Sequence, residues 1–271
     1  MSFKYTQDEL SEYFWHTLTL FNGCLDSDIS KDNVILEFFV PENGVDVYER
    51  YCGKYFPNML EEAYKTPGYF ETFGAQAFVG DLIYGVLIRL DIDFSLDEIV
   101  QMYLHEISHL FCTKNEIKGG HFFEKYCLGT GEENGKINAG YAIWREAVAD
   151  IMADSIISKN AVMTLRMVKN EVWKYYHMIS YGRPESKKAM SLVIAYIMIS
   201  KEVATQTDWA AAEKVIDRII GFRADTMKSI LKMVFENLHR SPFWEISLDF
   251  IRRLGDAYIF LLAQKALGKI E

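Results

Sequence analysis

The chain has 271 residues, of which 50% are hydrophobic and 14% aromatic, enough to build a large core in one bilobal protein or two closely packed subdomains. Its formal net charge of −9 argues against a nucleic-acid-binding surface, so nucleic acid is not an expected partner. The N-terminal residues lack an apolar run, and the later apolar run at residues 192–199 is too short to span a membrane, so no membrane partner is expected. The four cysteines are scattered and do not indicate a disulfide framework. We therefore expect a cytoplasmic protein.

The first third of the chain has the pattern of alternating short helices and strands. Residues 6–9 have the form of a capping box, which predicts that a helix begins there. Residues 33–40 read as a strand, and residues 77–91 alternate or run apolar as strands do, with Gly80 and Gly85 as expected bends or bulges. The pattern predicts a small mixed sheet.

The next helix carries the most informative pentapeptide of the chain, His105-Glu106-Ile107-Ser108-His109. Residues 95–98 form a second capping box, and apolar residues then recur near helical spacing. On such a helix His105 and His109 are offset by about 40°, so both rings can bind one metal ion, whereas Glu106 lies about 100° from His105 and is free to act as a base. This pattern indicates a zinc hydrolase; the alternative is a pair of ordinary histidines.

A second helix, at residues 140–150, offers the third ligand. Glu146 and Asp150 are four residues apart on an otherwise apolar face, where two carboxylates repel unless a cation or a donor lies between them. Glu146 can bind the metal directly, while Asp150 can accept the remaining N–H of a ligating imidazole. Asp154 continues the same face and reads as a polar residue near the helix end.

These two helices together resemble the gluzincins, the thermolysin-like branch of the zincin metallopeptidases, which carry HExxH on one helix and ExxxD on the next. The resemblance covers residues 95–157. It implies that His105, His109 and Glu146 bind Zn²⁺, that Glu106 is the general base and that Asp150 contacts a ligand histidine.

His121 leaves an alternative open for the third ligand. It lies in a Gly-rich, Phe-containing segment after the HExxH helix, which is where SprT-like zincins place a third histidine. We favour Glu146, because His121 does not explain the pairing of Glu146 with Asp150. His121 is then a loop residue or a residue at the rim of the substrate site.

The expected function is zinc-dependent hydrolysis of amide bonds in a peptide or protein substrate, with Glu106 as the general base. Zincins commonly pair extended substrate with an edge strand, and residues 85–90 are our candidate for it. The sequence leaves the oxyanion-stabilising residue unassigned, with Tyr141, His177 and Tyr181 as candidates. The alternative function is a non-catalytic zincin-like domain with a regulatory or binding role. Glu106 separates the two functions, because a structural metal site does not need an unligated carboxylate between its histidines.

Beyond residue 154 the apolar spacing is almost wholly helical. The expected helices are 161–176, 187–203, 209–220, 224–238 and 244–267. The predicted fold is therefore α+β and zincin-like, with a small mixed sheet beside the HExxH helix. Residues 1–157 would form the catalytic core with both metal helices, and residues 158–271 a helical lobe that closes the cleft.

Overall fold

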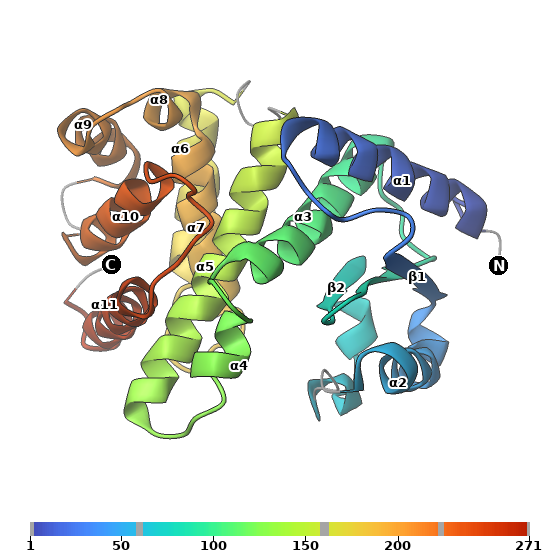
Figure 1. Cartoon of the computed structure of the whole chain (residues 1–271). Helices are drawn as coiled ribbons and strands as arrows, with labels where there is room; N and C mark the ends of the chain where they lie inside the picture. The colour runs from blue at the N-terminus through green and yellow to red at the C-terminus, as the bar shows by residue number, and fades with distance from the viewer. Residues whose placement is uncertain (1–2, 58–61, 158–162, 222–224, 270–271) are drawn as a thin grey trace. The chain divides into compact units, whose positions relative to one another are not determined.

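The computed structural model describes residues 3–57, 62–157, 163–221 and 225–269 (Figure 1). Packing divides the chain into two compact units, Met1–Thr113 and Lys114–Glu271. The first unit contains the sheet and the described part of the second is helical, so the chain is α+β as predicted. The packing boundary falls at Thr113 because the helix that carries Glu146 packs with the C-terminal helices. The functional division after residue 157 stays a prediction.

The first unit alternates helices, 3-10 turns and strands. Its elements are α1 (Gln7–Cys24), β1 (Val34–Phe39), η1 (Pro41–Asn43), α2 (Gly44–Tyr55), η3 (Glu62–Lys65), η4 (Tyr69–Glu71), β2 (Ala75–Val79), β3 (Tyr84–Arg89) and α3 (Leu96–Asn115). Helix α1 begins at the predicted capping box, in which the Thr6 backbone N–H donates to Glu9 Oε2 over 2.7 Å. The predicted strand at residues 33–40 is confirmed as β1.

The sheet has the order β1-β3-β2 within the described residues. Strand β1 runs parallel to β3, with Val34 opposite Tyr84, and β2 runs antiparallel to it, with Val79 opposite Tyr84. Strand β3 is thus hydrogen-bonded on both sides. The expectation that residues 85–90 form an edge strand is therefore wrong, because β1 and β2 occupy the two edges.

Gly85 lies inside β3 because aromatic rings press against the strand at that point. A Cβ atom at residue 85 would lie less than 3.0 Å from Tyr51 Oη and from the Phe56 ring. The Tyr51 hydroxyl continues past the strand and donates to Ile35 O of β1 over 2.7 Å. Phe56 stacks on Phe78 of β2 with ring centroids 5.5 Å apart. Helix α2 and its C-terminal extension therefore cover one face of the sheet through close aromatic contact.

Helix α1 lies alongside α3 (Figure 1). The rings of Phe14 and Tyr103 meet edge to face with centroids 5.3 Å apart, and the buried Tyr103 hydroxyl donates to Leu10 O over 3.2 Å. On the sheet side, a Cβ at Gly74, just before β2, would lie 2.6 Å from Met102 Sδ of α3. These contacts confirm that the sheet lies beside the helix that carries both histidines of the motif.

The second unit consists of helices across its described residues. They are α4 (Phe122–Tyr126), α5 (Glu132–Ile157), α6 (Leu165–Met178), α7 (Ser186–Ile199), α8 (Lys201–Ala204), α9 (Trp209–Ile220), α10 (Asp225–Leu238) and α11 (Leu248–Ala266). The predicted C-terminal helices are confirmed, with shifted starts. The helix expected from residue 244 begins at Leu248, because Ser247 caps it by accepting from the Phe250 N–H, and the helix expected from residue 161 begins at Leu165. Residues 161 and 224 themselves lie outside the described residues. The expected helix 187–203 divides at Ser200, whose hydroxyl donates to Ile197 O and whose backbone leaves the helical region.

Helices α5 and α11 touch through their backbones. A Cβ at Gly255 of α11 would lie less than 3.0 Å from Lys136 O and Gly140 N of α5. A Cβ at Gly140 would overlap Ile251 O in the same way. One turn away, Trp144 packs edge to face on Phe250 with centroids 5.0 Å apart. This close approach fixes α5, the helix that carries Glu146, against the C-terminal helix.

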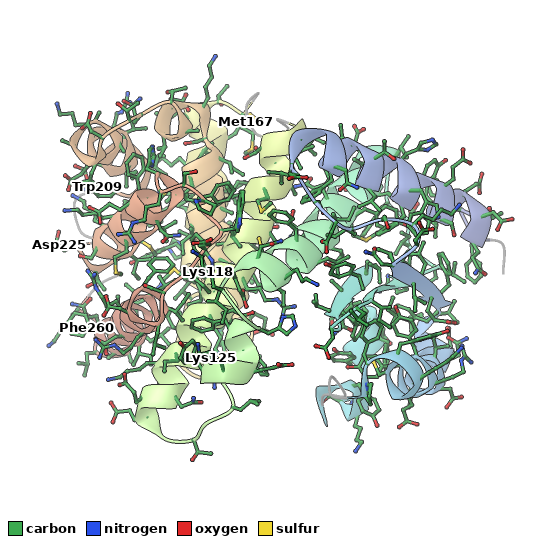
Figure 2. All side chains as sticks on the ribbon, in the orientation of Figure 1. Lys118, Lys125, Met167, Trp209, Asp225 and Phe260 are labelled. Atoms are coloured by element: carbon green, nitrogen blue, oxygen red, sulfur yellow. The ribbon has the colours of Figure 1, made fainter. Side chains whose placement is uncertain are left out.

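Some apolar side chains are exposed on the helical unit, among them Met167 of α6 and Phe260 of α11 (Figure 2). Singly exposed apolar residues of this kind are ordinary in folded proteins. Among the described residues, none of the helices has the length and apolar character needed to cross a bilayer.

Candidate metal site

Helix α3 positions the HExxH motif. At its start the Ser95 backbone N–H donates to Glu98 Oε2 over 2.7 Å, and the Glu98 N–H returns to Ser95 Oγ over 3.4 Å, which confirms the predicted capping box. Contact with Phe14 of α1, described above, holds the middle of the helix. The motif therefore lies on a helix that is capped at its start and packed against both α1 and the sheet.

The two histidines of the motif converge. Nε2 of His105 lies 3.0 Å from Nε2 of His109, and the rings are nearly perpendicular with centroids 4.6 Å apart. His109 is buried and His105 half-buried. Two nitrogens bound to one tetrahedral zinc ion would be about 3.3 Å apart, so the rings need to separate by only about 0.3 Å to share an ion.

Glu106 lies between the two histidines in sequence and is buried, with 9% of its surface exposed. Its position on α3 is about 100° around the axis from His105. A carboxylate at this position lies off the helix face that the two histidines share, and its role as a base stays a prediction.

Glu146 and Asp150 lie one turn apart on α5, and both are half-buried. Glu146 Oε2 forms an ion pair with Lys188 Nζ of α7, and the two atoms are 2.5 Å apart. The carboxylate therefore already has a cation beside it, as two neighbouring acids on an apolar helix require. The sequence offered no signal for Lys188, because its partner is set by the packing of α7 against α5.

Three predicted ligands form one group. Single ligand atoms of His105, His109 and Glu146 all lie within 4.8 Å of one another, and these residues could hold a metal ion. Two imidazole nitrogens and one carboxylate oxygen are a donor set that leaves a coordination position open on a four-coordinate ion. The residues thus fit a bound metal.

His121 does not belong to this group among the described residues. It is the residue before α4, with an extended backbone, and it follows Gly119 and Gly120, whose φ angles of 82° and 148° favour glycine. The Gly-rich segment thus forms a turn that leads into α4. Lys118, labelled in Figure 2, belongs to the same loop.

A buried acid that the sequence analysis did not single out lies just after α3. Glu116 is 3% exposed; Tyr141 Oη donates to its Oε1 over 2.9 Å, and the Phe122 N–H donates to the same oxygen over 3.0 Å. Burial raises the pKa of Glu116 to about 7, although these two hydrogen bonds and the charge of Arg145 act in the opposite direction. The Ile246 N–H also donates to Glu116 O, so this residue joins three segments of the helical unit.

The hydrogen bond to Glu116 bears on Tyr141 as a candidate oxyanion-stabilising residue. Tyr141 was a possible oxyanion-stabilising residue, but its buried hydroxyl is committed to Glu116, and burial raises its pKa well above the ordinary value. The other two candidates, His177 and Tyr181, are exposed. The oxyanion-stabilising residue therefore stays unassigned.

No protein-family model, no curated protein and no solved structure matches this chain.

Proposed function

We propose that this chain is a zinc-dependent peptidase of the zincin type. The observation that carries the proposal is the convergence of His105 and His109, whose Nε2 atoms are 3.0 Å apart on one helix, together with a carboxylate of Glu146 in the same ligand group. Borderline-soft Zn²⁺ suits two imidazoles and one carboxylate, and three protein ligands leave a position for water.

A bound zinc ion would supply a Lewis acid and lower the pKa of its water to about 7. Glu106 would accept a proton from that water and deliver it to the departing amine. Asp150, one turn after Glu146, would accept the remaining N–H of a ligand imidazole and so fix its tautomer. These roles match the gluzincin resemblance of residues 95–157.

An extended peptide substrate would need a strand edge with unpaired backbone groups. Because β3 is central, we propose β2 for this role in place of residues 85–90. Strand β2 is an edge strand, and Gly74 at its start lies against Met102, one turn before His105 on α3.

Zinc content tests the ligand assignment. We expect about one zinc per chain in the wild type, near-complete loss of zinc in Glu146→Ala, and retention in His121→Ala, which is the matched control for the alternative ligand. Elemental analysis after dialysis measures both. Loss of zinc from the His121 variant with retention in the Glu146 variant would contradict the gluzincin assignment.

Hydrolysis tests the role of Glu106. The Glu106→Gln variant should keep zinc, because Glu106 is not a ligand, yet cleave a peptide library at least about 100-fold more slowly. Identical cleavage by wild type and variant would contradict the mechanism.

The non-catalytic alternative is favoured by one observation, the ion pair of Lys188 with Glu146. If Lys188 is the permanent partner of Glu146, then Lys188→Met will not tighten zinc binding, and neither wild type nor Glu106→Gln will cleave the library. If the metal displaces Lys188, then Lys188→Met should raise zinc affinity, since one competing cation is removed. Isothermal titration with zinc separates the two cases.

A further inference from the structure

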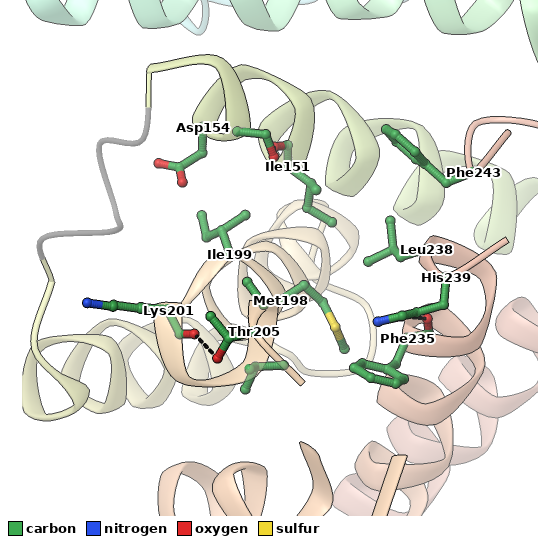
Figure 3. A pocket seen from close by; sticks show the side chains of 13 residues that line it. Ile151, Asp154, Met198, Ile199, Lys201, Thr205, Phe235, Leu238, His239 and Phe243 are labelled. Atoms are coloured by element: carbon green, nitrogen blue, oxygen red, sulfur yellow. Dashed lines mark hydrogen bonds between the residues drawn. The ribbon is translucent and has the colours of Figure 1, made fainter. Parts of the chain in front are cut away.

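A cavity of about 500 Å³ lies wholly within the helical unit, where several helices end (Figure 3). Its lining comes from the last turns of α5, α7 and α10, together with α8 and residue 243. Asp154, on its α5 side, is two turns beyond Glu146, about 12 Å further along the helix. The volume falls within the range of sites that bind small organic molecules.

The walls of the cavity are mainly apolar. The side chains that Figure 3 shows around it include Ile151, Met198, Ile199, Phe235, Leu238 and Phe243. These side chains are aliphatic, thioether and aromatic groups, and all three kinds favour contact with an apolar part of a ligand. The two phenylalanine rings can also attract a cation through their faces.

The polar groups of the lining offer hydrogen-bond acceptors. Ser155 Oγ donates its proton to Ile151 O over 2.7 Å, and Thr205 Oγ1 donates to Lys201 O over 2.9 Å, the dashed line in Figure 3. A hydroxyl has one donor and two acceptor positions, so each of these can only accept from a ligand. Both ring nitrogens of His239 face backbone carbonyls, Phe235 O at 2.8 Å from Nδ1 and Gln206 O at 3.0 Å from Nε2, so this ring contributes no acceptor for a ligand.

The fixed charges of the cavity favour a cation. The α5, α7 and α10 helices end at Ile157, Ile199 and Leu238, and a helix C-terminus carries a partial negative charge. Asp154 adds a carboxylate, which has several acceptor positions. Lys201 is exposed, and in Figure 3 its ammonium points away from Met198 and Phe235. Solvent around an exposed charge screens it.

We propose that this cavity binds a primary ammonium carried on an apolar body. The ammonium would donate to Asp154 and Ser155, and the body would lie against Met198, Phe235 and Phe243. This site would be independent of zinc and of the proposed peptidase activity.

Three probes with the same chain and different head groups test the proposal: n-octylammonium, n-octanol and octanoate. In calorimetric titrations at pH 7 we expect octylammonium to bind at least 10-fold more tightly than octanoate, with octanol between them. Hexylammonium should bind about 15-fold more weakly than octylammonium, because each buried methylene changes the dissociation constant about fourfold. Octanoate binding as tightly as octylammonium, or no binding by any probe, would overturn the proposal.

Variants place the binding in this cavity. Ala204→Phe puts a ring into the cavity from an exposed lining position and should weaken octylammonium at least 10-fold. Asp154→Asn should remove the advantage of octylammonium over octanol. Glu236→Gln, which removes an exposed carboxylate of α10 that does not line the cavity, is the matched control and should change nothing. Unchanged binding in Ala204→Phe would refute the proposed location even if Asp154→Asn fails to fold.

Discussion

Because α5 and α11 are in backbone contact, we predict that alanine at a glycine of this contact destabilises the protein, although helix propensity alone would favour alanine. Replacing a helical glycine by alanine stabilises an exposed helix by about 1 kcal/mol. At Gly255, however, the new Cβ would lie less than 3.0 Å from three backbone atoms of α5, including Lys136 O and Gly140 N. Overpacking costs about 1–3 kcal/mol, and backbone atoms cannot rotate away, so the upper end applies. We expect Gly255→Ala to lower the free energy of unfolding by about 2 kcal/mol net.

Gly135, one turn before Gly140 on α5, is the matched control, since a Cβ there would meet nothing within 4 Å. Gly135→Ala should stabilise the protein by up to about 1 kcal/mol. Urea denaturation measures both variants, and thermal melting should show a decrease of about 4–8 °C for Gly255→Ala. A Gly255→Ala variant as stable as the wild type would refute the inference that the two backbones are in contact.

Three further predictions concern a proton, a metal and a strand. Burial raises the pKa of Glu116 from 4.5 to about 7 in the folded protein, so the favourable contribution of its neutral carboxyl is present below pH 4.5 and is lost as the pH rises through 7. Between these pH values the wild type should lose about 3 kcal/mol of stability relative to Glu116→Gln. Urea denaturation at several pH values measures this difference. Chelation should lower the melting temperature, because zinc at 100 times its dissociation constant adds about 2.7 kcal/mol, and an unchanged melt after verified metal removal would contradict an ordered site. Gly85→Ala should destabilise the protein by about 1–3 kcal/mol through overlap with Tyr51 and Phe56, whereas Gly23→Ala, in open space, should not; equal melting of the two variants would count against this packing.

The sequence predicted those parts of the fold that depend on local chemistry. The starts of α1 and α3 follow from capping boxes, whose partners are three residues apart, and the C-terminal helices follow from apolar periodicity. Strand order could not be predicted in this way, because residues 85–90 have the same apolar character in a central strand as in a covered edge strand. The position of β3 depends on its pairing with β1, fifty residues earlier in the chain.

The same distinction applies to the candidate site. His105 and His109 had to converge if α3 formed, because one helix fixes both positions. The inclusion of Glu146 in the group required the tertiary fold, and the carboxylate pattern on α5 only made it a candidate. Lys188 and Glu116 were missed because a lone lysine or glutamate in sequence shows neither its partner nor its burial.

The mixed sheet also determines the order in which its strands can assemble during synthesis. Strands β2 and β3 are joined by a short turn, closed by a hydrogen bond of 2.8 Å from Gly80 N to Ile83 O, and such a hairpin forms within microseconds. Strand β1 pairs with β3 only after the intervening loop closes, which costs entropy that local pairing does not. On a ribosome, Tyr51 of α2 and Phe56 just after this helix would therefore emerge before the strand that covers them. Both side chains would be exposed to chaperones until β3 has left the exit tunnel.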